Sequence, residues 1–149
     1  NESGFQLLAR AQAQLTPDHL LALEQFSVGG FDTVRGYREN QVVRDNGWVM
    51  SVEARYPLFR FSVPELELGK GAPVELAPFY DIGRSWNNDV LTGDLDLLHS
   101  LGVGLRWQPH PRVRGHLYYA KALTGRDASP IDDDLQDEGV HFQISADLF

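Results

Sequence analysis

Two short motifs hold the residues with the clearest potential for a specific interaction. The first, Thr33-Val34-Arg35-Gly36-Tyr37-Arg38, lies in a connection of about 30 residues between two strand-like runs, and the second, Phe79-Tyr80-Asp81-Ile82-Gly83, lies within another such run. A buried arginine needs a carboxylate, and its planar guanidinium can bind two of them. Because Asp81 falls on the polar face of its run, the motifs predict a loop folded into the lumen of a β-barrel and held there by an Arg35–Asp81 ion pair.

The sequence contains no motif for catalysis or for a bound cofactor. It has no nucleophile elbow, phosphate loop or zinc motif, its five histidines lack ligand spacing, and it has no cysteine. The formal net charge of −8 argues against nucleic acid binding, which requires clustered lysine and arginine. We therefore expect neither an enzyme nor a metal or cofactor site.

Many of the carboxylates lie close together, in residues 127–138. Such a run favours a solvated loop. A calcium site is the sharper alternative, but the spacing of an EF-hand loop, with its glycine and terminal glutamate, is absent.

Apolar and polar residues alternate in six runs, and this period of two predicts β-strands. The last run shows it well, because Val140, Phe142 and Ile144 alternate with polar residues. The predicted strands are approximately 4–15, 47–59, 73–86, 99–107, 112–123 and 139–149. The sequence thus predicts an all-β, antiparallel, up-and-down fold with at most one helical turn, near residues 17–24.

The alternation fits two environments. A soluble β-domain turns its apolar face inward, whereas a membrane barrel turns it toward lipid. Runs of about 9–13 residues suit tilted membrane strands, and long connections at one end with a tight turn at the other are typical of outer-membrane barrels. A soluble β-domain that binds a ligand or partner remains the alternative.

Six strands are too few to close a membrane barrel, which needs at least eight. No apolar run is long enough for a transmembrane helix, and the sequence starts at Asn1 without an initiator methionine. We therefore expect a piece of a longer protein, whose remaining strands come from upstream sequence or from other copies of the chain.

Residues 23–39, which include Gly29-Gly30 and the Val34-Arg35-Gly36-Tyr37 motif, resemble the TpsB transporters of two-partner secretion, the haemolysin-activator family. These transporters share a superfamily with the BamA and TamA barrel-assembly proteins. Further matches follow in the family's order and span nearly the whole chain: Asn46-Gly47-Trp48, Glu53-Ala54-Arg55-Tyr56-Pro57, Phe79-Tyr80-Asp81-Ile82-Gly83, Gly102-Val103-Gly104-Leu105-Arg106-Trp107 and the terminal Phe149.

The resemblance implies a 16-stranded barrel of which residues 1–149 form the C-terminal part. It also implies a lumen-entering loop at about 16–46, and periplasmic POTRA domains that are not visible in this sequence. The motif arginine Arg35 would pair with the inner wall, where Asp81 and Phe79 match the family pattern. Glu53 shares the polar face of its run, so we expect it to be a second carboxylate partner.

Two glycines fit this arrangement: Gly36 would let the loop tip turn tightly, and Gly83 would leave space beside Asp81. Four arginines are candidates for the lumen wall, with cross-strand pairing to Glu53, Glu75 and Asp147 as the alternative: Arg55, Arg106, Arg112 and Arg114.

The C-terminal Phe149 matches the aromatic residue that ends family barrels and belongs to their assembly signal. It departs from the pattern because it shares parity with Asp147 and not with Leu148. Either the last strand bulges near its end, or the assembly signal is read differently.

We therefore expect a non-enzymatic bacterial outer-membrane transporter that secretes a partner exoprotein, contacts membrane lipid and depends on the barrel-assembly machinery. The alternatives are a barrel-assembly insertase of the same superfamily and the soluble β-domain described above.

Overall fold

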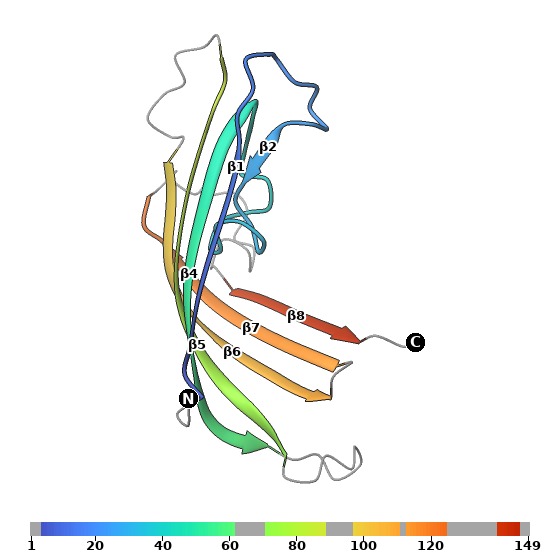
Figure 1. Ribbon diagram of the computed structural model, residues 1–149, viewed down its shortest axis with the longest axis vertical. Coiled ribbons are helices and arrows are strands. Elements are labelled where there is room, and N and C mark those ends of the chain that lie inside the picture. Colours follow the sequence, from blue (N-terminus) through green and yellow to red (C-terminus); the bar gives the residue numbers. More distant parts are fainter. Residues whose placement is uncertain (1–3, 62–70, 89–96, 111–112, 125–139, 147–149) are drawn as a thin grey trace, which may run out of the picture.

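The computed structural model describes residues 4–61, 71–88, 97–110, 113–124 and 140–146. Six strands form one antiparallel sheet in the order β1-β4-β5-β6-β7-β8. Their bounds are Gln6–Gln14 (β1), Asn46–Phe61 (β4), Ala72–Trp86 (β5), Leu97–His110 (β6), Val113–Ala122 (β7) and Val140–Ala146 (β8). Figure 1 shows the sheet as a long, curved wall.

The predicted all-β, antiparallel, up-and-down arrangement is confirmed. Each strand of the sheet pairs with the next one in the chain, except that the segment between β1 and β4 is set aside from the sheet. The strands β4 and β6 are longer than predicted, extending to Phe61 and from Leu97 to His110. The alternation of apolar and polar residues weakens at both places, at Leu58-Phe59 and around Pro109. The pattern therefore predicted that these strands exist but not where they end.

The two faces of the sheet differ in character. One face, here called the outer face, exposes large apolar side chains along the middle strands: Met50, Val52, Tyr56, Tyr80, Leu101, Val103, Leu105, Leu117 and Tyr119. The other, the inner face, carries buried polar and charged side chains: Ser51, Glu53, Asp81, Ser85 and Ser100. This is the inversion expected of a membrane barrel, in which lipid solvates the apolar face.

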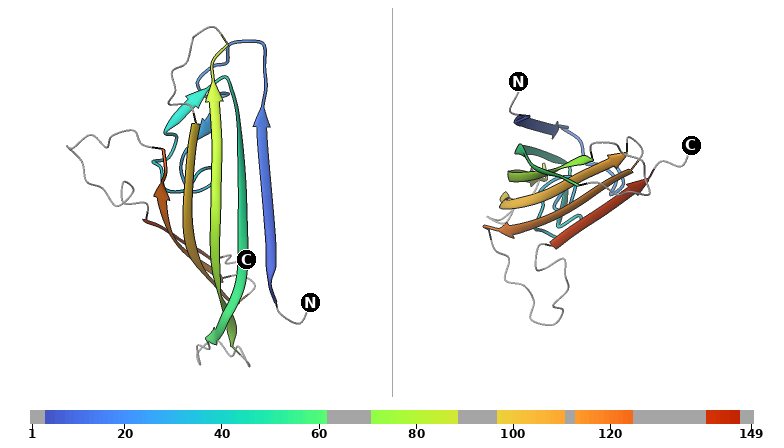
Figure 2. Two further views of the ribbon diagram at one scale, coloured as in Figure 1. Left: turned by 90° about the vertical axis from the view of Figure 1, so that its left-hand side faces the viewer. Right: turned by 90° about the horizontal axis from the view of Figure 1, so that it is seen from below.

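The segment between β1 and β4 covers the inner face. It contains a short hairpin, β2 (Phe26–Val28) and β3 (Val42–Arg44), whose strands pair antiparallel. Figures 1 and 2 show this segment on the concave side of the sheet. We expected one long loop here, so the hairpin is a correction: its strands are three residues each, too short for a period of two to be recognised.

The hairpin and the sheet enclose an apolar cluster that fixes the segment in place. Its buried members are Phe26, Val28, Val34, Tyr37, Val42, Val49 and Leu98. The sequence allowed at most one helical turn near 17–24, and the structure agrees, because a single backbone hydrogen bond from Glu24 N to Leu21 O closes a turn there. None of the described residues forms a helix long and apolar enough to cross a membrane.

Candidate functional site: the arginine of the inner-face loop

The Val34-Arg35-Gly36-Tyr37 motif lies between β2 and β3 and is buried against the inner face. Gly36 has a φ of 91°, a backbone conformation that side chains with a Cβ rarely adopt. A Cβ at Gly36 would also lie 2.9 Å from the Cβ of Ala120 on β7. The glycine therefore allows the loop tip both to turn and to approach the sheet closely.

The Arg35 guanidinium bridges β4 and β5. Its Nε and Nη2 donate to the two oxygens of Asp81 at 2.7 and 2.9 Å, and its Nη1 donates to Glu53 Oε2 at 2.7 Å. Its Nη2 also donates to Ser51 Oγ at 3.2 Å. The structure thus brings together Arg35 and the two carboxylates named from the sequence.

Asp81 is fully buried, and its carboxylate oxygens accept four hydrogen bonds. Besides the guanidinium, the backbone N of Arg35 donates to its Oδ2 at 3.1 Å and Ser51 Oγ donates to its Oδ1 at 2.6 Å. Sequence reasoning missed Ser51, although the residue shares the polar face of its strand with Glu53. Four donated hydrogen bonds satisfy a buried negative charge that would otherwise be strongly destabilising.

Two aromatic rings face the same guanidinium. Arg35 Cζ lies 3.4 Å from the ring centroid of Phe79 and 4.8 Å from that of Tyr118. Phe31, from the loop itself, packs edge-on against Tyr118 with the ring centroids 5.6 Å apart. Cation–π contact with a desolvated guanidinium contributes about 2 kcal/mol, so these rings add to the ion pairs in holding the loop.

The surroundings also favour the charged form of the arginine. Burial alone would lower the pKa of Arg35, but the hydrogen bonds and negative charge of Asp81, followed by those of Glu53, raise this pKa above its ordinary value. Arg35 is therefore a permanent cation in the inner-face site.

Val34 and Gly83 explain how the loop can lie so close to β5. Val34 is fully buried, and a Cβ at Gly83 would lie 3.0 Å from a methyl carbon of Val34 and 2.8 Å from one of Val28. The space beside Asp81 that Gly83 leaves is thus occupied by loop side chains.

Glu53 connects the motif to further charges on the inner face. Its second oxygen, Oε1, accepts from Arg55 Nε at 2.8 Å and from Arg106 Nη1 at 3.3 Å. Arg106 Nη1 also donates to the hydroxyl of Tyr118 at 2.9 Å. Of the four arginines expected on the lumen wall, Arg55 and Arg106 thus join the site, while Arg112 lies outside the described residues.

Tyr37 forms a second anchor near the ends of β6 and β7. Its hydroxyl donates toward the carbonyl oxygens of His99 and Thr124, at 2.9 and 2.8 Å, and lies 2.9 Å from Thr124 Oγ1. The backbone N of Thr124 in turn donates to the Tyr37 oxygen at 3.2 Å. The motif is therefore fixed at one point by Arg35 and at another by Tyr37.

A third anchor lies where the segment rejoins the sheet. Asp45 is almost fully buried, and its Oδ1 accepts from the backbone N of Leu20 and the side-chain amide of Gln25, both at 3.0 Å. The hydrogen bond from Leu20, then that from Gln25, and the nearby His19 lower the pKa of Asp45, although burial opposes this effect. No pattern in the sequence pointed to Asp45.

Two cavities lie on the inner face beside the motif. One, of about 210 Å³, is lined by loop and wall residues that include Phe31, Arg35 and Glu53, and also by Leu8, the residue that interrupts the alternation of β1. The other, of about 420 Å³, is lined by residues that include Glu75 and Trp107.

Other sequence predictions fall outside what the structure describes. Phe149 and the acidic run 127–138 are not among the described residues, and the side chains of Val140, Phe142 and Ile144 are not described either. Among the described residues, no cluster of three or more histidine or carboxylate side chains could hold a metal ion.

Comparison with known protein families matches residues 1–107 to the haemolysin secretion/activation proteins ShlB/FhaC/HecB. The chain belongs to this family. Two similar proteins are both named "Outer membrane transporter CdiB", one from Escherichia coli O6:K15:H31 (strain 536 / UPEC) and one from Escherichia coli. They are 40% and 38% identical to the chain over 52 residues, which are 35% of the chain and 9% of each relative.

Family membership and the names of these relatives place the chain in the bacterial outer membrane. The outward apolar face of the sheet agrees with that location. The aligned residues span only 9% of each relative.

Proposed function

We propose that this chain forms part of the wall of an outer-membrane β-barrel through which the parent protein secretes a partner exoprotein. The observation that carries this proposal is the Arg35 bridge, which holds a covering segment against the inner face through Asp81 on β5 and Glu53 on β4. A segment fixed inside a barrel wall can brace or obstruct the pore. The family match and the two relatives named as transporters support the same function.

In this proposal the six strands belong to a 16-stranded barrel and residues 1–149 form its C-terminal segment, with POTRA domains elsewhere in the parent protein. Residues 16–46 are the lumen loop. Phe149 would belong to the signal that the barrel-assembly machinery reads, and membrane lipid would cover the outer face, where Met50, Leu101 and Leu105 are exposed.

The mechanism requires positioning and displacement, not covalent chemistry. Arg35 ties the loop to two neighbouring strands in the closed arrangement, and Tyr37 ties it to the ends of β6 and β7. A passing polypeptide would displace the loop or strain the wall to which the loop is bound. The proposal therefore needs no cofactor, no metal and no nucleotide.

The test is secretion by the full-length parent protein carrying Arg35→Ala. We expect secretion of the exoprotein to be lost while the amount of folded barrel in the outer membrane, measured by heat-modifiable migration, falls much less. Arg38→Ala is the matched control, because Arg38 is an exposed arginine of the same loop. Normal secretion by the Arg35 variant would refute the proposed role.

The same strains separate the transporter from an insertase. If the parent protein is a transporter, other outer-membrane barrels reach their usual abundance in the Arg35→Ala strain. If their abundance falls together with secretion, the insertase is the correct function and the transporter is excluded.

A further inference from the structure

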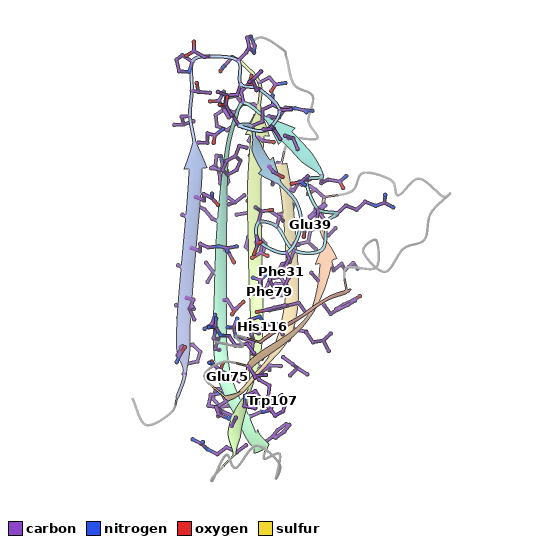
Figure 3. The ribbon with its side chains drawn as sticks, turned by 90° about the vertical axis from the view of Figure 1, so that its right-hand side faces the viewer. Phe31, Glu39, Glu75, Phe79, Trp107 and His116 are labelled. Atoms are coloured by element: carbon purple, nitrogen blue, oxygen red, sulfur yellow. The ribbon has the colours of Figure 1, made fainter. Side chains whose placement is uncertain are left out.

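Two arginines of the inner face, Arg55 and Arg106, line both cavities, and so does His116. Arg106 on β6 is the register partner of His116 on β7 and of Glu75 on β5, and Arg55 lies on β4, the strand on the other side of β5. These residues therefore form the boundary between the two cavities. Figure 3 shows His116 below Phe31 and Phe79, with Glu75 and Trp107 farther along the wall.

The two guanidiniums share a single acceptor. Arg55 Nε and Arg106 Nη1 both donate to Glu53 Oε1, whereas the other oxygen of Glu53 is occupied by Arg35. A guanidinium has five N–H donors. Within the described part of the chain, the only other acceptor of these two guanidiniums is the Tyr118 hydroxyl.

Both guanidiniums are partly desolvated. Their side chains are 19% and 21% exposed for Arg55 and Arg106. Hydrogen bonds from a charged, partly buried donor are stronger than those in open water. An anion in either cavity would find preorganised donors at the boundary.

Resting on the function proposed above, we propose that Arg55 and Arg106 form a transient binding site for the carboxylate side chains of the polypeptide being exported. The larger cavity is lined by Pro73, Trp107 and Pro109, near the sheet end where β6 ends at His110 and β7 begins at Val113. Such a short connection marks the periplasmic side of these barrels. A chain entering there meets the larger cavity first and the smaller cavity, under the Arg35 loop, second.

One carboxylate of the wall opposes the site. Glu75 lines the larger cavity and is the register partner of Arg106, but the two are not close enough for an ion pair. Glu75 would repel an incoming carboxylate and shorten its stay. A site that holds acidic side chains only briefly suits a pore, because binding must be weak enough for the chain to move on.

The test measures blockade of single-channel current by the full-length parent protein in planar lipid bilayers. The probe is a short peptide of alternating Ser and Glu, added from the periplasmic side, and its control is the same peptide with Gln in place of Glu. We expect the Glu peptide to block for longer. Equal dwell times of the two peptides on the unmodified protein would overturn the proposal without any variant.

Variants then locate the site. Arg106→Gln and Arg55→Gln should each shorten the dwell time of the Glu peptide by about tenfold, the effect of losing one charge-assisted contact. Glu75→Gln should lengthen the dwell time. Arg114→Gln is the matched control, because Arg114 lies on the inner face of β7 but lines neither cavity.

If Arg114→Gln shortened the dwell time as much as Arg106→Gln, the peptide would be responding to the overall electrostatic field of the lumen, and a local site would be refuted. Heat-modifiable migration shows which variants fold, and one folded arginine variant is enough to test the site. Secretion assays keep the two proposals apart. If the unmodified protein secretes normally but does not discriminate between the two peptides, only the site is refuted, whereas absence of secretion by the unmodified protein refutes the proposed function.

Discussion

Replacing Asp81 with Asn should release the inner-face loop without disturbing the sheet. The substitution keeps the shape of the side chain but turns one carboxylate oxygen into an NH2 group. Both oxygens of Asp81 accept two hydrogen bonds each, from Arg35 and from Ser51. Whichever way the amide is oriented, its NH2 group would face two donors.

The magnitude follows from the loss of the Asp81 charge, because both guanidinium contacts, at 2.7 and 2.9 Å, lose their charged acceptor at a fully buried position. Each hydrogen bond to a charged group contributes about 1.5–3 kcal/mol. Breaking a desolvated ion pair by removing one partner costs roughly 3–5 kcal/mol. We therefore expect the free energy of loop opening to fall by roughly 3–5 kcal/mol, or about a hundred- to several-thousand-fold in the opening equilibrium.

Hydrogen–deuterium exchange of the full-length protein in detergent measures this opening directly, because the backbone N–H of Arg35 itself donates to Asp81. The amides of residues 33–37 should exchange faster by that factor, while the amides of 101–105 in β6 should not change. Arg35→Lys should behave like Asp81→Asn, since an ammonium cannot reproduce the planar fork. Loop exchange accelerated less than tenfold, or equal acceleration in β6, would refute the reasoning.

Two further predictions concern the second anchor and the outer face. Tyr37→Phe removes a hydroxyl that is hydrogen-bonded to the carbonyls of His99 and Thr124, so it should destabilise the ends of β6 and β7 by about 1–3 kcal/mol. The measurement is amide hydrogen exchange, which should be faster at these strand ends and unchanged in β4. Val103→Arg should lower the folding free energy in lipid vesicles, measured by urea titration, by about 2–4 kcal/mol, because Val103 lies on the outer face midway along β6. Leu123→Arg, just beyond the end of β7, is its control and should cost only about 0–1 kcal/mol; equal losses would show that Val103 does not face acyl chains.

Much of the fold was predictable because its information is local. A period of two specifies which side chains share a face whatever lies on either side of the sheet, and thus Ser51, Glu53 and Asp81 fall on one face. The need of a buried arginine for carboxylates likewise follows from residue chemistry. The pairing of Arg35 with Asp81 and Glu53 was accordingly expected, and the structure brings these residues together.

The remaining features of the fold and the site depend on contacts between residues far apart in the sequence, which no local pattern reveals. The β2–β3 hairpin is too short to show periodicity, and its position is set by an apolar cluster that joins Phe26 and Val42 to Val49 and Leu98 on the sheet. Asp45 became an anchor because the turn at Leu20 lies beside it, a contact across 25 residues. Such contacts exist only after the strands have paired.

The sequence by itself thus determined the strands, their two faces and the charges that had to meet. The tertiary structure alone decided that the covering segment lies on the polar side, that Phe79 and Tyr118 enclose the guanidinium, and that Arg55 and Arg106 share Glu53. The physical reason is that alternation is a property of one strand, whereas desolvation of a charge depends on every element that surrounds it.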